Sequence, residues 1–169
     1  YNDNDFVNEH HLSRHCIGLS GMGFTDAEIE QLAGRIRKMK ETGTHLCCSI
    51  GFLTEKQAKM LKDAGLDRIN HNLNSSRNYY SHICTTHTFD QRVENIHMLQ
   101  RLGFEICSGG IIGMGESKED VVDMLLELKE INPEALPINF LLPIPGTPLG
   151  DQDISGLTYE YGIKVLCLA

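Results

Sequence analysis

The chain has 169 residues, of which 41% are hydrophobic and 22% charged, a mix that is ordinary for a globular domain with a sizeable core. The formal net charge of −8 argues against nucleic acid as a partner, and no apolar run approaches the length of a membrane span. The polar first residues lack the pattern of a signal peptide. Six cysteines without a dense, short-spaced framework favour a reducing compartment over a secreted disulfide scaffold.

Five short apolar runs have the residue types of buried β-strands. In chain order they are His15–Leu19, His45–Ile50, Asp67–Leu73, Phe104–Ile112 and Pro137–Leu142. Each run is followed by turn residues and then by apolar residues at helical spacing, the last helix beginning near Tyr159.

Four of the helices are expected to begin at a Thr or Ser cap with an acid or glutamine three residues later. These pairs are Thr25 with Glu28, Thr54 with Gln57, Thr88 with Gln91, and Ser117 with Asp120. The caps are 29, 34 and 29 residues apart, which is the length of a β/α unit with short loops. Glycines at 43, 65 and 103 stand where helix C-caps belong.

Alternating strands and helices predict a parallel sheet in an α/β fold. About five such units fit either a doubly wound sheet or part of a (β/α)8 TIM-type barrel. The even spacing favours the barrel, and a complete barrel needs about 250 residues. We therefore expect this chain to be the middle of a barrel.

In such folds the functional side chains gather at the carboxyl ends of the strands. Cys47 and Cys107 each fall four residues after a helix-ending glycine, Gly43 or Gly103, and Cys16 lies on the first strand in a comparable setting. Three inward thiols from three strands could hold an iron–sulfur cluster or a soft metal. The alternative for each cysteine is a small buried hydrophobe, because the spacing is dispersed and contains no CxxC pair.

The other three cysteines are interpreted as structural. Cys48 follows Cys47 directly and must face the opposite side of a strand. Cys84 falls in a loop and Cys167 on the last helix.

Amide side chains mark the third and fifth strands. If the third strand continues, Asn70, Asn72 and Asn74 share one of its faces, which suits hydrogen bonding to a polar ligand. The alternative is a strand end that turns into an Asn-rich loop. His71 should point the opposite way in a packed role, and Asn139 is either a satisfied core amide or a ligand contact.

Arg92 lies in the first turn of its expected helix. Its position favours a surface charge paired to Asp90 or Glu94. The alternative is a guanidinium that binds a ligand carboxylate in a bidentate manner.

The segments NHNLN, TTHT and CSGGIIGMGE, with HCIGLS before them and PINFLLPIPGTPL after them, resemble the central region of the biotin synthase family. These are radical S-adenosylmethionine enzymes, and the resemblance covers nearly the whole chain from about Arg14. It implies a (β/α)8 barrel. Residues 14–169 would then be the central part of the barrel, truncated at both ends, and residues 1–13 a polar N-terminal segment.

The resemblance implies the conversion of dethiobiotin to biotin by sulfur insertion at two unactivated carbons. It implies a [4Fe–4S] cluster that cleaves S-adenosylmethionine to a radical, and a [2Fe–2S] cluster that gives up sulfur. By motif position, Cys16, Cys47 and Cys107 match three ligands of the [2Fe–2S] cluster.

The remaining site residues also follow from motif position. Asn72 and Asn139 match residues that hydrogen-bond the substrate, and Asn72 also lies near the S-adenosylmethionine ribose. Asn74 stands where some members carry Asp, which weakens its expected ribose contact. Arg92 matches an arginine near the S-adenosylmethionine carboxylate.

Two parts of the family pattern are absent from the 169 residues. The CxxxCxxC loop for the [4Fe–4S] cluster would precede Tyr1, and the arginine that completes the [2Fe–2S] ligand set would follow Ala169. The fragment alone is therefore expected to be inactive.

The resemblance also implies an intact protein that is a homodimer, cytoplasmic or in the mitochondrial matrix, and reduced by flavodoxin or ferredoxin, with no nucleic-acid or membrane partner. The alternatives are another radical S-adenosylmethionine barrel enzyme or a non-catalytic metal-binding β/α module.

Overall fold

The computed structural model describes residues 9–10 and 12–169, so most of the expected polar segment 1–13 lies outside the described residues. The chain divides into two compact units. The first unit comprises Tyr1–His71 and Glu94–Ile106, and the second comprises Asn72–Val93 and Cys107–Ala169.

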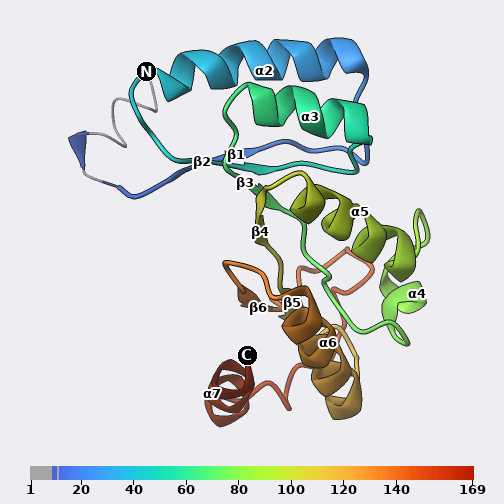
Figure 1. Ribbon diagram of the computed structural model, residues 1–169. Coiled ribbons are helices and arrows are strands. Elements are labelled where there is room, and N and C mark those ends of the chain that lie inside the picture. The colour runs from blue at the N-terminus through green and yellow to red at the C-terminus, as the bar shows by residue number, and fades with distance from the viewer. Residues whose placement is uncertain (1–8, 11) are drawn as a thin grey trace. The chain divides into compact units, whose positions relative to one another are not determined.

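The first unit is built on a four-stranded sheet in the order β1-β2-β3-β4. Its strands are β1 (His15–Gly18), β2 (Leu46–Ser49), β3 (Arg68–Asn70) and β4 (Glu105–Cys107), the last of which ends where the second unit begins. The pairs β1–β2 and β2–β3 are parallel, as the alternation of strands and helices predicts. Helices α2 (Asp26–Lys40) and α3 (Glu55–Asp63) lie together on one side of β1, β2 and β3 (Figure 1).

The core of the first unit forms between these helices and the sheet. The apolar stripe of α2 is buried at Ile29, Ala33 and Ile36, because helical spacing puts these residues on one face. Ile69 of β3 and Ile106 of β4 are fully buried.

Helix α5 (Phe89–Arg101) begins in the second unit and ends in the first. The capping pairs predicted for α2, α3 and α5 are all present, as in Thr25, whose side chain accepts the Glu28 N–H while the Glu28 carboxylate accepts the Thr25 N–H. The three expected C-cap glycines have positive φ angles of 77° at Gly43, 97° at Gly65 and 79° at Gly103. The boundaries of α2, α3 and α5 are therefore confirmed as local sequence signals.

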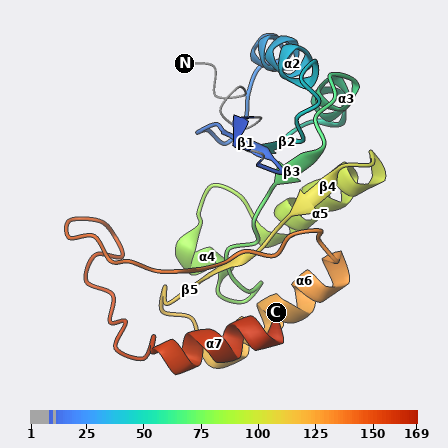
Figure 2. The same cartoon turned by 90° about the vertical axis from the view of Figure 1, so that its left-hand side faces the viewer.

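The second unit contains a two-stranded parallel sheet and three more helices. Its elements are α4 (Tyr80–Ile83), β5 (Gly110–Ile112), α6 (Lys118–Ile131), β6 (Ile138–Phe140) and α7 (Tyr159–Leu168). Ser117 caps α6 as predicted, and α6 and α7 lie side by side (Figure 2). Short α4 falls in the stretch after the third strand, where the sequence predicts only a loop.

The prediction of one continuous strand over Phe104–Ile112 is wrong. The structure divides it into β4 and β5, which belong to different sheets. The hydrogen-bonding partner changes between them, since the Glu105 N–H donates to Asp67 whereas the Ser108 N–H donates to Ala135. A Cβ atom on Gly109 would overlap the carbonyl group of Pro137, so the chain passes this point only with a glycine there.

No helix in the described part of the chain is both long enough and apolar enough to span a bilayer.

Asp67 ties β2 and β3 to the end of α2. Its carboxylate accepts the Leu46 N–H at 2.8 Å and the Lys40 ammonium at 2.9 Å. Burial raises the pKa of Asp67, but the Leu46 N–H and the Lys40 charge outweigh burial, and the pKa lies below its ordinary value of 3.8.

We expect Asp67→Asn to lower the free energy of unfolding by about 1 kcal/mol at pH 7. Because the folded-state pKa is below the unfolded one, the charged carboxylate stabilises the fold above about pH 4, and this contribution is lost as the pH falls through the folded value. The difference between wild type and variant should therefore shrink below pH 4. Urea unfolding across this range checks it, with exposed Asp63→Asn as the control, expected to change stability by less than about 0.5 kcal/mol. A difference that does not change with pH would contradict the assignment.

Candidate functional site

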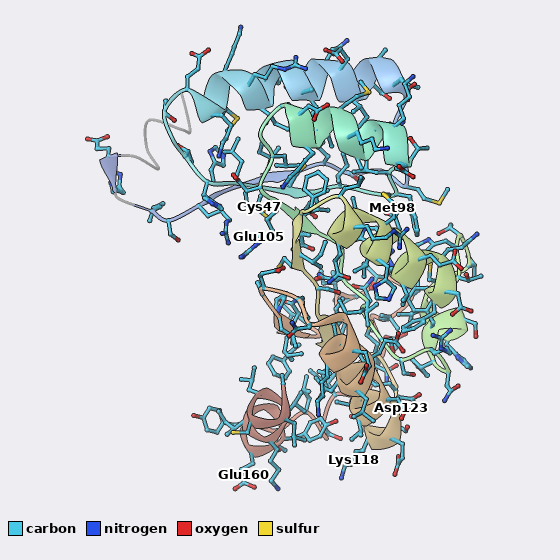
Figure 3. The ribbon with its side chains drawn as sticks, in the orientation of Figure 1. Cys47, Met98, Glu105, Lys118, Asp123 and Glu160 are labelled. Carbon is cyan, nitrogen blue, oxygen red and sulfur yellow. The ribbon has the colours of Figure 1, made fainter. Side chains whose placement is uncertain are left out.

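Two of the three predicted metal-ligating cysteines are brought together in the first unit. Cys16 of β1 and Cys47 of β2 are register partners on adjacent parallel strands, so their side chains leave the same face of the sheet. Cys47 is 4% exposed, whereas Cys16 on the outer strand is exposed. Figure 3 shows Cys47 at the sheet, with α2 and α3 on the sheet's other side.

Charged residues share this face, and sequence reasoning missed them. Arg68 is the register partner of Cys47, and its Nη2 lies 2.7 Å from Oε2 of Glu105 on β4. Arg14, just before β1, reaches the same oxygen at 3.1 Å. The sequence could have placed Arg14 on this face, because Arg14 precedes Cys16 by two residues and side chains two apart on a strand share a face. The three residues carry a net charge of +1.

Cys107 is the last residue of β4. It shares a strand face with Glu105, because Ile106 between them is fully buried and side chains alternate. Within the second unit Cys107 also bridges to Ala135. Among residues 9–10 and 12–169, no group of three or more His, Cys, Asp or Glu side chains is positioned to hold a metal ion. The assignment of all three cysteines as ligands therefore stays a prediction.

The cysteines interpreted as structural differ from one another. Cys48 is fully buried, and burial raises the pKa of its thiol to about 12, so the structural interpretation is confirmed. Cys167 is exposed on α7, so it is not the buried hydrophobe that its sequence context favours. Cys84 is half-buried among polar groups.

The prediction that three asparagines share one strand face is wrong, and the loop alternative is correct. Strand β3 ends at Asn70, and Asn74 has a φ of 71°, which breaks the alternation of a strand. Asn72 lies between them, and its Oδ1 accepts the Gly109 N–H at 3.2 Å. That oxygen is therefore used within the fold, and the role of Asn72 in binding a ligand stays a prediction. His71 is buried and stacks edge-on to Phe52, as its predicted packed role requires.

Asn139 is exposed on β6, opposite Ile111 of β5. The interpretation as a satisfied core amide is therefore wrong, and the interpretation as a ligand contact stays a prediction.

Arg92 is half-buried in the first turn of α5. Its Nε donates to the Tyr80 hydroxyl at 2.6 Å, and its Nη2 lies 2.5 Å from Nε2 of His87. Asp90, one of the surface partners considered for Arg92, forms an ion pair with Arg77. Arg92 is thus held by neighbouring polar side chains instead of extending freely into solvent.

The glycine-rich turn after β5 is closed by Glu116, whose carboxylate accepts the N–H groups of Gly113 at 2.6 Å and Met114 at 2.7 Å. Gly113 and Gly115 have φ angles of 99° and 108°, which glycine adopts without strain. The sequence predicted the turn but not the acid that closes it.

Parallel strands with intervening helices, and thiols and amides at strand ends, define an α/β fold of the TIM-barrel type. The radical SAM superfamily model matches residues 6–128, so the chain belongs to that superfamily. Membership implies S-adenosylmethionine and an iron–sulfur cluster as cofactors.

Curated relatives indicate which members of the superfamily this chain resembles. A protein named biotin synthase from Sulfurihydrogenibium sp. (strain YO3AOP1) is 45% identical to this chain over 157 residues, which cover 92% of this chain and 46% of the relative. In Bacillus subtilis (strain 168) the identity is 43% over 158 residues, covering 93% and 47%. The resemblance to biotin synthases is thus confirmed, and the chain spans about half the length of the curated relatives it matches.

Solved structures show the fold. Methylornithine synthase has a TM-score of 0.78 at 20% identity, covering 98% of this chain and 51% of that one. The FeFe-hydrogenase maturase from Carboxydothermus hydrogenoformans has a TM-score of 0.72 at 14% identity, covering 98% and 42%. The prediction of a partial β/α barrel with parallel strands is confirmed.

Proposed function

We propose that the intact protein containing this chain is a biotin synthase, which inserts sulfur into dethiobiotin with S-adenosylmethionine as cosubstrate. Residues 14–169 would be the central part of its barrel. The observation that carries the proposal is the pair of in-register thiols, Cys16 and Cys47, in a chain 45% identical to a protein of that name.

The donor set suits an iron–sulfur cluster. Thiolates are the ligands such clusters take, and the carboxylate among the neighbouring groups is already paired with Arg14 and Arg68. Cys16, Cys47 and Cys107 would hold the [2Fe–2S] cluster. When bound, this cluster would supply the sulfur, and the [4Fe–4S] cluster with S-adenosylmethionine would supply hydrogen-atom abstraction.

The chain's own residues would bind and orient the small molecules. Asn72 would donate from its amide to the substrate and to the S-adenosylmethionine ribose, since its oxygen already accepts the Gly109 N–H. Asn74 would add a ribose contact, and exposed Asn139 a substrate contact. Arg92, oriented by Tyr80, would bind the S-adenosylmethionine carboxylate.

Further elements of the proposal rest on the family resemblance. They are a flavodoxin or ferredoxin as electron donor, a homodimer, and a cytoplasmic or mitochondrial-matrix location.

The proposal predicts that the intact protein, reconstituted anaerobically with iron and sulfide, converts dethiobiotin to biotin in the presence of S-adenosylmethionine and reductant. Biotin and 5′-deoxyadenosine are quantified by mass spectrometry, with dethiobiotin omitted as the control. Formation of 5′-deoxyadenosine without biotin would assign a different radical chemistry. Formation of neither product by a cluster-loaded protein would favour the non-catalytic metal-binding module.

A further inference from the structure

A cavity of about 560 Å³ lies in the second unit, between α4 and the start of α5. It is lined by Arg77, Tyr80, Ser81, Cys84 and the residues from Thr85 to Gln91. Cys84 is the nucleophilic side chain in this lining, and it is half-buried. The cavity is large enough for a small peptide-sized molecule.

Polar groups of the following loop contact the Cys84 sulfur. Its Sγ lies 3.5 Å from the Thr86 hydroxyl oxygen, 3.5 Å from Nδ1 of His87 and 3.6 Å from Nε2 of the same ring. Partial burial raises the pKa of the Cys84 thiol, but the Thr86 hydroxyl, the backbone N–H groups of Thr86 and His87 and the Arg92 charge outweigh burial, and the pKa falls below its ordinary value. Apart from Arg92, which lies on α5, the groups that stabilise a thiolate come from the loop that directly follows the cysteine.

A second layer of side chains sets the direction of these hydrogen bonds. Nε2 of His87 faces the Tyr80 hydroxyl at 2.8 Å and the Arg92 guanidinium at 2.5 Å, and both groups donate. Nε2 is therefore an acceptor, and the His87 proton sits on Nδ1. Nδ1 lies 3.0 Å from the Thr86 oxygen, so it donates to Thr86, and the Thr86 hydroxyl proton is directed to the sulfur.

The titratable groups around the sulfur keep the protonation states that these hydrogen bonds require. Burial and the Arg92 charge lower the pKa of His87, which keeps the imidazole neutral near pH 7. Burial raises the pKa of Tyr80, so its hydroxyl stays protonated. Arg77 and Asp90 also line the cavity, and they are paired with each other.

We propose that Cys84 is a reactive thiolate that undergoes exchange with small disulfides, forming a mixed disulfide inside this cavity. The Cys84 thiolate attacks one sulfur of the disulfide and forms a new S–S bond. The original S–S bond breaks, and its electron pair leaves with the second sulfur as a thiolate. Cys84 is oxidised, half of the reagent is reduced, and no other oxidant is needed. This inference goes beyond the proposed function and does not depend on it.

The chain provides an internal reference for the reactivity of Cys84. Cys167 is exposed on α7, and Cys47 and Cys48 are buried. Of the six described cysteines, Cys84 combines access to solvent with a pKa below its ordinary value.

The test is competitive labelling of the intact protein with iodoacetamide and, separately, with glutathione disulfide, followed by peptide mass spectrometry. At pH 7 we expect Cys84 to react about tenfold faster than Cys167. Thr86→Val should slow Cys84 about threefold and move the midpoint of its pH profile upward, whereas Thr86→Ser should restore both. Thr85→Val is the matched control, because it makes the same change in an exposed neighbour that also lines the cavity.

Equal or slower labelling of Cys84 than of Cys167 would overturn the proposal. So would a pH profile that Thr86→Val leaves unchanged while the thermal midpoint shows a folded protein. Labelling by iodoacetamide without a mixed disulfide from glutathione disulfide would overturn the proposed ligand class. None of these results depends on biotin formation, so failure of the proposed function would be seen separately.

Discussion

Replacing Gly109 by alanine is expected to lower the free energy of unfolding by about 3 kcal/mol, the largest effect on stability that we predict for a single methyl group. The new Cβ atom would overlap the carbonyl oxygen of Pro137, which is a main-chain atom and cannot rotate away. The Gly109 N–H, which donates to Asn72, and the Gly109 carbonyl, which accepts the Asn74 N–H, would be displaced with it. Urea unfolding of the purified protein measures the change.

Gly34→Ala is the matched control. Gly34 lies within α2, and nothing stands within 4 Å of the position that a Cβ atom would take. The same methyl group should there stabilise the protein by about 0.5–1 kcal/mol, because alanine loses less backbone entropy in a helix. If both variants changed stability by the same amount, the close approach at Gly109 would not be the cause.

If the proposed function holds, Cys47→Ala is expected to abolish the [2Fe–2S] cluster and to reduce biotin formation by roughly 100-fold or more, while the fold is retained. The reason is position, since Cys47 faces the same side of the sheet as Cys16 and Arg68. Iron and sulfide per chain, together with the visible absorption spectrum, give a readout that does not require turnover.

Cys48→Ala is the control variant, with the same change at the next residue of the strand. Cys48 is fully buried, and its pKa near 12 keeps the thiol protonated at neutral pH, so it is not a thiolate ligand. We expect this variant to keep the cluster and to lose about 1 kcal/mol of stability from the cavity left behind. Loss of iron in Cys48→Ala, with full iron in Cys47→Ala, would mean that Cys48 and not Cys47 is the ligand.

The sequence determined the helix ends because these depend on residues close together in the chain. The caps at Thr25, Thr54 and Ser117 are present as predicted, and Gly43 and Gly65 have the positive φ angles of C-caps. Each such signal is a hydrogen bond or a backbone conformation within a few residues. The parallel pairing of strands followed from the regular spacing of these signals.

The sequence also identified Cys16 and Cys47 as equivalent positions, and their shared register agrees with that. It did not show that Phe104–Ile112 breaks into two strands, because the break depends on Ala135 and Pro137, about thirty residues away along the chain. Asn72 could not be recognised as a partner of Gly109 for the same reason.

The charged cluster of Arg14, Arg68 and Glu105 and the hydrogen bonds around Cys84 were decided only by the tertiary structure. Arg14 and Glu105 are 91 residues apart in the chain, and no local pattern pairs them. Cys84 lies close to its partners in sequence, yet the turn that aims Thr86 and His87 at its sulfur depends on Tyr80 and Arg92 from two different helices. Hydrogen bonds and ion pairs need positions set to within about 0.5 Å, and packing between elements sets those positions.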